Sequence, residues 1–501
     1  MSKEIVIDVS YNQVRIGLLE EGDLVEIYID NKECQRKVGN IYQGKVENVL
    51  PGMQAAFVNI GLEKNAFLYK SDINKSLYEL EDTDDCVIEK LKDLSISDVI
   101  KQGQHITVQV VKDAIGTKGP RVTTHITLPG RYLVLMPTVN YVGVSRKIED
   151  ECERNRLKGI VEDIKPENIG VIVRTAAEKK EAKRLKEDLH CLLKIWENIR
   201  KKAGSGRVPK LIYKEESLIN RIIRDLFTDD IDKLIINDEK EYKNILELLD
   251  GVSPALKDRV FHYQGDVDIF DYYQVETKIN KALNKKVWLK CGGYIVIDQT
   301  EALSSIDVNT GKFVGTVNLQ DTVLKTNLEA AEEIAKQLRL RNIGGIIIID
   351  FIDMDNDQHK QMVIDHLKQA LKKDKTKTSV LGFTALGLVE MTRKKVTPRL
   401  SSILQKPCPY CHGLGKVLDE NAMIAKILKE IERKFRHTKG QAVWVQVHPS
   451  IASLLEKGCY RKLVKDLESK YNRNIYIIKS SDVHAEKMNI KMGDVEVSKE
   501  V

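Results

Sequence analysis

The sequence predicts a multidomain protein of mixed α/β and α+β modules. Its 501 residues exceed what one hydrophobic core usually organises. Short strands separated by turn residues between 39 and 128 predict a small barrel. A strand, a long helix and a buried strand follow one another within 279–400, which indicates an α/β unit. These observations set the fold class before any motif is considered.

The other elements follow from local patterns. Residues 4–30 alternate in polarity and turn at Gly22, which predicts a β-meander. The acidic segment 79–90 is typical of a solvated loop between barrel strands. A charged helix is expected from Glu178 to about Lys202, and α/β alternation without a Gly-rich phosphate-binding motif continues to about residue 275. No nucleotide-binding loop is therefore expected.

Composition narrows the class of protein. With 42% hydrophobic and 31% charged residues and no apolar stretch near 20 residues, the chain is not expected to span a membrane. The first ten residues, MSKEIVIDVS, lack the pattern of a signal peptide, and the scattered cysteines indicate no disulfide framework. We therefore expect a cytoplasmic protein. A net charge of +6 permits a polyanionic partner without requiring one.

Two acidic residues sit where strands are expected to end. Asp307 and Asn309 stand two apart in SIDVNTG and so leave one face of a strand. Asp350 ends the apolar run IIIID. Turns favour Asp, which is an alternative explanation for any one of these positions. Two carboxylates on neighbouring strands would also hold Mg²⁺, with Asn309 in support, and permit hydrolysis of a nucleic acid.

Basic and aromatic residues point to the same substrate. Basic residues flank the Asp350 strand and suit phosphate contacts, although a solvated face explains them equally well: Lys336, Arg339, Arg341, Arg393, Lys394, Lys395 and Arg399. In the predicted barrel, Phe57 and Phe67 lie among basic residues such as Lys45 and Lys112. Exposed aromatic rings in such a barrel stack on unpaired bases, whereas buried ones belong to the core.

A Cys-x-x-Cys pair raises a question of ligand number. Cys408 and Cys411 stand in KPCPYCHGLGK, and the other six cysteines are isolated. His412 directly follows Cys411 and is a poor ligand to the same ion. Because a structural zinc site takes four ligands, either a distant His completes it or two chains share the metal.

Long motifs then connect the chain to a family. EALSSIDVNTG, NLEAAEEIAKQLRLRNIGGIIIIDFIDM, LGLVEMTRKK and CPYCHGLG resemble the bacterial ribonuclease E/G family, its shorter members in particular, over nearly the whole chain. The resemblance implies an RNase H-like fold split by an inserted S1-like OB barrel, then a DNase I-like catalytic region, a zinc link and a small C-terminal domain. The implied bounds are 1–38 with 215–278 (RNase H-like), 39–128 (S1-like), 129–214 (5′-monophosphate sensor), 279–400 (catalytic), 401–416 (zinc link) and 417–501 (C-terminal).

The resemblance also implies roles for individual residues. Asp307 and Asp350 would bind Mg²⁺, and Asn309 would help to place the scissile phosphate. Arg174, Thr175 and Val134 would form the 5′-phosphate pocket; Phe57, Phe67 and Lys112 would contact RNA; Cys408 and Cys411 would share one Zn²⁺ with a second subunit. Lys147 stands where the family carries the second of two arginines, which keeps the charge and loses the planar fork.

The implied function is a Mg²⁺-dependent endoribonuclease. It would cut single-stranded, A/U-rich RNA, favour 5′-monophosphorylated substrates, and act in processing of rRNA precursors and in mRNA decay. A homodimer or homotetramer would form through the shared zinc. The sequence ends at Val501 without a long disordered extension, so a scaffold role is not expected. The alternatives are a non-catalytic RNA-binding protein and a filament-like assembly protein.

Overall fold

The computed structural model describes residues 2–31, 36–73, 95–114, 118–311, 319–395 and 397–493. The chain divides into two compact units, Met1–Ile403 and Leu404–Val501. Described strands form five sheets, four in the first unit and one in the second. The expected acidic loop 79–90 lies outside the described residues.

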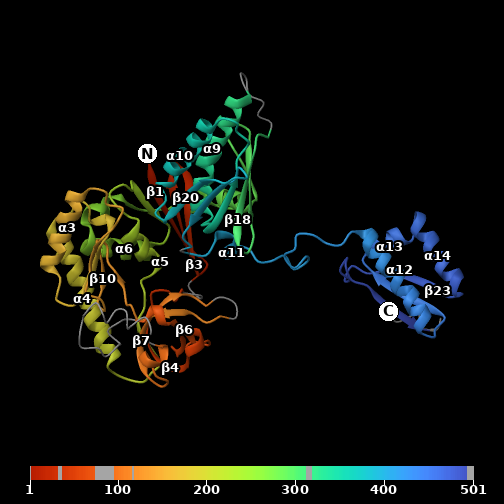
Figure 1. Cartoon of the computed structure of the whole chain (residues 1–501), viewed down its shortest axis with the longest axis horizontal. Helices are drawn as coiled ribbons and strands as arrows, with labels where there is room; N and C mark the ends of the chain where they lie inside the picture. The colour runs from red at the N-terminus through yellow and green to blue at the C-terminus, as the bar shows by residue number, and fades with distance from the viewer. Residues whose placement is uncertain are drawn as a thin grey trace. The chain divides into compact units, whose positions relative to one another are not determined.

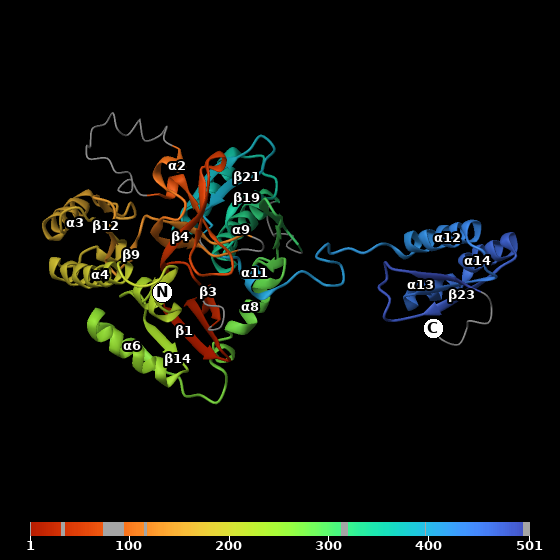
Figure 2. The same cartoon turned by 90° about the horizontal axis from the view of Figure 1, so that it is seen from below.

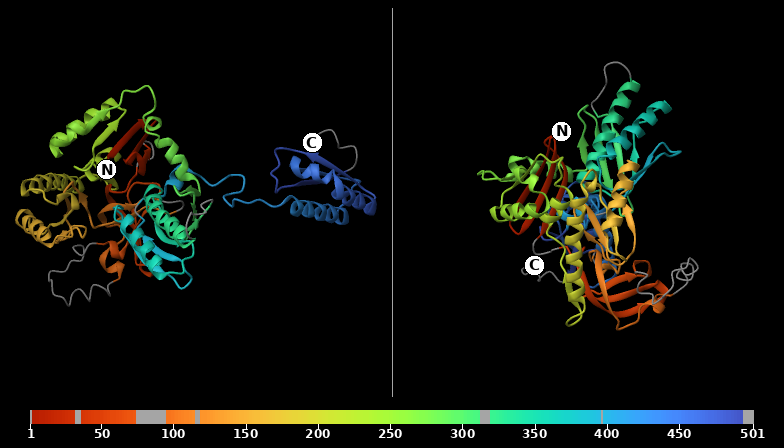
Figure 3. Two further views of the ribbon diagram at one scale, coloured as in Figure 1. Left: turned by 90° about the horizontal axis from the view of Figure 1, so that it is seen from above. Right: turned by 90° about the vertical axis from the view of Figure 1, so that its left-hand side faces the viewer.

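The first sheet joins two distant parts of the chain. Its strands run in the order β15 (Val260–His262), β14 (Lys233–Ile236), β1 (Lys3–Ser10), β2 (Gln13–Glu20) and β3 (Asp23–Asn31). β1, β2 and β3 are antiparallel neighbours, so the predicted meander is confirmed, whereas β14 adds to β1 in parallel. Helices of this part are α5 (Leu218–Asp225), α6 (Glu239–Val252), α7 (Ile269–Tyr272) and α8 (Val275–Leu283), and Figure 3 shows α6 beside the sheet.

A small barrel lies between these two parts of the sequence. Five strands close it in the order β4 (Ile41–Leu50), β5 (Ala55–Asn59), β6 (Ala66–Tyr69), β8 (Arg121–Thr123) and β7 (His105–Lys112), with β7 pairing back to β4. The short helix α2 (Ile96–Val99) and the added strand β13 (Lys210–Tyr213) flank β4. The predicted barrel, consistent with an S1-like OB fold, is therefore confirmed.

The next sheet is smaller and carries two helices. Its strands are β11 (Val142–Val144), β12 (Gly170–Val173), β10 (Leu133–Met136) and β9 (Leu128–Pro129), in that order. The helices α3 (Glu151–Ile164) and α4 (Ala182–Ala203) contact each other and this sheet, as Figure 2 shows. α4 buries Leu185, Leu189 and Leu192, spaced three or four residues apart, against the sheet.

The fourth sheet has one covered and one open face. Its order is β16 (Lys286–Trp288), β17 (Tyr294–Gln299), β18 (Leu303–Asn309), β19 (Gly345–Asp350), β21 (Val389–Arg393) and β20 (Thr378–Phe383). The long helix α9 (Leu319–Leu340) and α10 (Asp357–Leu371) pack on one side (Figure 1). Alternate residues such as Ile306, Val308 and Ile347 are buried there. Their neighbours on β18 and β19 face the opposite, open side.

The second unit is a three-stranded α/β module. β22 (Ala442–Val447) pairs in parallel with β23 (Asn474–Lys479) and antiparallel with β24 (Asn489–Gly493). Its helices are α12 (Glu420–His437), α13 (Pro449–Leu455) and α14 (Gly458–Tyr471), and the short α11 (Leu400–Leu404) precedes it. The mixed α/β multidomain class is confirmed, while the domain names and bounds given above stay predictions. None of the described helices is long and apolar enough to cross a membrane.

Candidate active site

Two carboxylates meet on the open face of the fourth sheet. β18 and β19 are parallel, and their register places Asp307 directly beside Asp350. Both side chains are exposed, because the residues before them, Ile306 and Ile349, point into the core beneath. The two acids that the sequence singled out are therefore lateral neighbours.

The electrostatics of this pair suit a cation. Asn309 Nδ2 donates a hydrogen bond to Asp307 Oδ2 at 2.8 Å, which orients that carboxylate. Burial raises the pKa of Asp350, and the negative charges of Asp307 and Asp353 raise it further. A divalent cation between the carboxylates would relieve this repulsion. Hard oxygen ligands on two carboxylates, with open space for water and phosphate, fit Mg²⁺.

Within the described ranges, no group of three or more His, Cys, Asp or Glu side chains converges as a metal cage. The two neighbouring carboxylates, Asp307 and Asp350, offer two acidic ligands. Mg²⁺ is usually bound by one or two carboxylates, and water and substrate phosphate supply its other ligands.

A buried asparagine fixes the chain beside Asp350, and the sequence did not reveal it. Asn327 of α9 is fully buried. Its Nδ2 donates to the Ile352 carbonyl at 2.9 Å, and its Oδ1 accepts from the Ile352 N–H at 3.1 Å. These paired bonds hold the backbone two residues beyond Asp350. The segment TNLEAA mixes polar and apolar residues, so the polarity of Asn327 also fits an exposed helix position.

A second residue of α9 fixes the turn between β16 and β17, beside Asn309. Glu329 accepts hydrogen bonds from the backbone N–H groups of Lys290 and Cys291 in the turn between β16 and β17. Gly293 follows this turn, and a Cβ there would lie 2.8 Å from the Asn309 carbonyl. The strand carrying Asn309 and its neighbour thus approach closely because position 293 is glycine.

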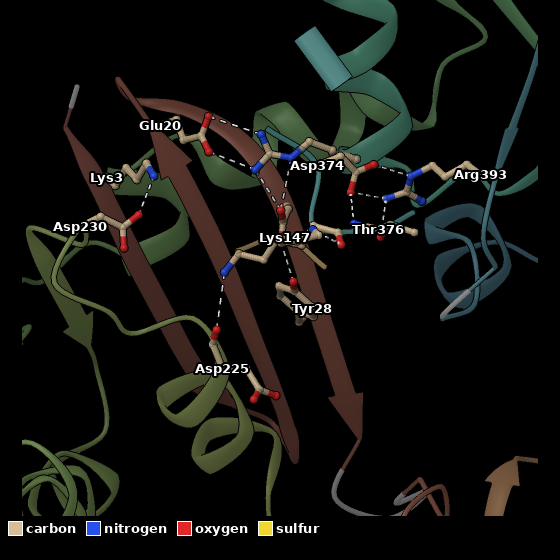
Figure 4. Close-up of polar contacts among 12 residues, drawn as sticks. Lys3, Glu20, Tyr28, Lys147, Asp225, Asp230, Asp374, Thr376 and Arg393 are labelled. Carbon is tan, nitrogen blue, oxygen red and sulfur yellow. Dashed lines mark hydrogen bonds and ion pairs between the residues drawn. The ribbon is translucent and has the colours of Figure 1, made fainter. Parts of the chain in front are cut away.

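Three basic residues predicted to contact RNA are buried instead. Arg339, at 7% side-chain exposure, pairs with Glu20 and Glu26 and joins α9 to the first sheet. Arg393 pairs with Asp374 at 2.6 Å, both almost fully buried (Figure 4). The third, Arg341, is also buried. Arginine counts in the sequence could not separate such packing ion pairs from a phosphate-binding face.

The barrel gathers the predicted RNA contacts into one row. Phe57 is paired with Phe67, Phe67 with Arg121, and Arg121 with Lys112 across four adjacent strands. The Phe57 and Phe67 rings lie edge to face at 5.4 Å. Tyr69 extends the cluster, 4.5 Å from Phe67 and under the Arg121 guanidinium at 4.7 Å. The sequence reasoning missed Tyr69 and Arg121, although both belong to the strand pattern.

The predicted 5′-phosphate residues also come together. Val134 on β10 pairs with Ile172 on β12, and Arg174 follows two residues on, so Val134 and Arg174 share a face. Thr175 is the next residue and is exposed. Arg174 Nη1 lies 2.7 Å from Asp225 and donates to the Gly130 carbonyl at 2.6 Å. The guanidinium is therefore already oriented by protein groups.

Lys147 and Arg146 take no part in that contact. Arg146 is exposed, and Lys147 Nζ donates to the Lys375 carbonyl at 2.6 Å, next to β20 (Figure 4). Lys375 Nζ in turn lies 3.5 Å from the Asp225 carbonyl. Lysine at 147 thus links the four-stranded sheet of β9 to β12 to the segment before β20 in the fourth sheet. An ammonium fills this role with single hydrogen bonds.

The Cys pair forms a tight turn in the second unit. Cys411 Sγ accepts a hydrogen bond from the Gly415 N–H at 3.2 Å, and Gly413 and Gly415 both have positive φ. Backbone hydrogen bonds from Cys411 and Tyr410 lower the pKa of the Cys408 thiol. Thiolate character and N–H bonds to sulfur fit Zn²⁺, with two ligands from this chain.

An aromatic and basic row on a small barrel, together with a carboxylate pair on an open sheet, fits the class of metal-dependent nucleases. Residues 127–396 match the ribonuclease E/G family, and residues 407–493 match its thioredoxin-like domain. The chain is 44% identical over 459 residues to ribonuclease G of Escherichia coli (strain K12), covering 91% of this chain and 93% of that protein.

Two further relatives give the same result. Ribonuclease G of Haemophilus influenzae is 44% identical over 452 residues, covering 90% of this chain and 91% of that protein. Ribonuclease E of Nostoc sp. (strain PCC 7120) is 39% identical over 419 residues, covering 83% of this chain and 59% of that protein. The chain belongs to the ribonuclease E/G family, and the predicted enzyme class, endoribonuclease, is confirmed.

Proposed function

We propose that the protein hydrolyses single-stranded RNA with Mg²⁺ held by Asp307 and Asp350. The observation that carries the proposal is the lateral pairing of these two carboxylates on an exposed sheet face, where their charges repel each other. Bound Mg²⁺ would stabilise the charge that builds on the phosphodiester and favour attack by water. The products would carry a 5′-phosphate and a 3′-hydroxyl.

The protein's own groups position the substrate. Asn309 orients Asp307 and helps to place the scissile phosphate, and Asn327 holds the chain after Asp350. Phe57 and Phe67 offer rings to unpaired bases, while Lys112 contacts a phosphate at the end of the same row. Unpaired, A/U-rich RNA suits this site because stacking needs bases that are free of a partner strand.

A second anchor binds the 5′ end. Arg174 and Thr175 grip a terminal monophosphate, with Val134 at its floor, since a guanidinium and a hydroxyl complement a dianion. Asp225 and Gly130 keep the Arg174 guanidinium in place. Tethering by this pocket speeds cleavage of 5′-monophosphorylated RNA. Precursors of rRNA and decaying mRNA in the cytoplasm are the substrates that we propose.

Two chains share one Zn²⁺ through Cys408 and Cys411. Each chain supplies half of a tetrahedral site, which makes the metal a clasp for a homodimer or a homotetramer. The mass of the assembly tests this part.

The alternative is an RNA-binding protein that holds its ligand without cutting. Cleavage and binding of a 5′-monophosphorylated, unpaired A/U-rich RNA separate the two, with wild type compared with Asp307→Asn and Asp350→Asn. Asp355→Asn, an exposed acid five residues beyond Asp350, is the matched control. We expect both site variants to bind RNA without cutting, and the control to cut normally. Binding without cleavage by wild type at every Mg²⁺ concentration would establish the alternative.

A further inference from the structure

Two aromatic side chains, Trp288 exposed and Tyr294 partly buried, share the open sheet face with the carboxylates. Trp288 on the edge strand β16 pairs with Tyr294 on β17, and Tyr294 pairs with Asn309 on β18. Side chains of directly paired residues leave the same face of a sheet. The row Trp288, Tyr294, Asn309 therefore runs beside the row that ends in Asp307 and Asp350.

Trp288 is presented to solvent, and Tyr294 beside it is partly buried, outside the core. Trp288 is 60% exposed, and its ring lies 5.4 Å from that of Tyr294. The neighbouring core residues Ile295 and Ile297 point to the opposite face, beneath α9. Packing therefore leaves most of the Trp288 surface without a protein partner.

A cation lies over both rings. Lys286 Nζ is 3.5 Å from the Tyr294 ring centroid and 4.1 Å from the Trp288 ring centroid. A positive charge with two aromatic rings is the combination that binds unpaired nucleotides, because the rings stack on a base and the cation attracts a phosphate. The turn between β16 and β17 is held by Glu329, so the pair is pre-oriented.

The spacing brings this pair within reach of a nucleotide next to the cleaved bond. Trp288 lies two strands from Asn309, or about 10 Å at the usual strand spacing. We propose that Trp288 and Tyr294 form a stacking platform for one unpaired base beside the scissile phosphate, with Lys286 on its backbone. The inference rests on the proposed function and adds a base contact on the fourth sheet itself, separate from the barrel row.

Binding tests the platform apart from cleavage. RNA affinity is measured in the Asp350→Asn background for Trp288→Ala, Trp288→Phe and Phe261→Ala. Phe261 is the matched control, an exposed aromatic on an edge strand of the first sheet. We expect Trp288→Ala to weaken binding about 5- to 150-fold, the loss of one stacked base. The RNA affinity of Trp288→Phe should stay within a few-fold of that of the Asp350→Asn parent. The RNA affinity of Phe261→Ala should equal that of the parent.

Cleavage locates the base. In the Asp350-containing protein, Trp288→Ala should raise KM and keep kcat, which also shows an intact fold. Cleavage rates of wild type and Trp288→Ala are then compared on a series of RNAs, each with one abasic nucleotide at a different position. An abasic nucleotide at one position next to the cleaved bond should slow cleavage by wild type. The same abasic nucleotide should not slow cleavage by Trp288→Ala any further.

Three results would overturn the platform. Trp288→Ala could bind and cut like Phe261→Ala, or every abasic penalty could persist in Trp288→Ala. The variant could also change the mass of the assembly with unaltered RNA affinity, which would assign the face to self-association. A wild-type protein that binds RNA and never cuts it overturns the proposed function instead, and the affinity comparison still decides the platform.

Discussion

Asn327 is the residue whose loss tests most sharply how the fold supports the site. Replacing Asn327 with Ala removes both hydrogen bonds to Ile352 and leaves a backbone N–H and a carbonyl without partners. Each unpaired buried group costs about 1–3 kcal/mol, so the two groups together should cost about 2–6 kcal/mol of local stability around β19. Asp350 then loses its fixed position, and kcat/KM should fall on the order of 10- to 100-fold.

Hydrogen exchange followed by mass spectrometry measures this change where it occurs. The chain has several domains, so one global unfolding energy is not well defined, whereas exchange in peptides covering β19 reports local opening. Glu332→Ala is the control, an exposed residue on the same helix. Asn327→Ala should speed β19 exchange and slow cleavage, and the control should do neither. Unchanged exchange or unchanged kcat/KM in Asn327→Ala would refute the reasoning.

Three more predictions follow from the described contacts. Arg393→Met should destabilise the fourth sheet by about 3–5 kcal/mol, because Asp374 stays buried without its partner. The same variant should leave the salt dependence of RNA binding unchanged, and a weaker salt dependence would contradict the assignment of Arg393 to a buried ion pair. Cys408→Ser with Cys411→Ser should lower the assembly mass in light scattering, whereas Cys459→Ser, an exposed cysteine elsewhere, should not; a persistent assembly would exclude the clasp. In metal-free buffer, the raised pKa of Asp350 means that the folded state holds the proton of this carboxyl more tightly than the unfolded chain does. Thermal stability should therefore fall as pH rises from the ordinary Asp pKa through the raised pKa of the folded state. Asp350→Asn or added Mg²⁺ should remove that component, and identical pH curves for wild type and variant would count against it.

Strand periodicity and the expected strand ends allowed the sequence to single out the two acids. Residues that stand two apart on a strand share a face, and a carboxylate after an apolar run marks the end of the strand. The parallel pairing that joins Asp307 to Asp350 follows from the intervening helix α9, which a parallel connection requires. For the same reason Phe57 and Phe67 could be placed on neighbouring strands.

Other parts of the site depend on tertiary register that local patterns do not carry. Arg121 reaches the row beside Lys112 through an irregular register between β7 and β8, so its position could not be counted from spacing. The burial of Asn327 depends on which face of α9 packs on the sheet, which local patterns do not give. Its polarity alone suggested an exposed helix face. Arg339 and Arg393 show the converse, since charge suggested exposure and ion pairs bury them.

The most direct test of the central claim is single-turnover cleavage across Mg²⁺ concentrations by wild type and Asp350→Asn, each first shown to bind the same RNA. We predict that the wild-type rate rises with Mg²⁺ and saturates, while the variant binds RNA and stays at least 100-fold slower at every concentration. A variant that cuts within about tenfold of wild type would contradict the assignment of the metal to the Asp307 and Asp350 pair.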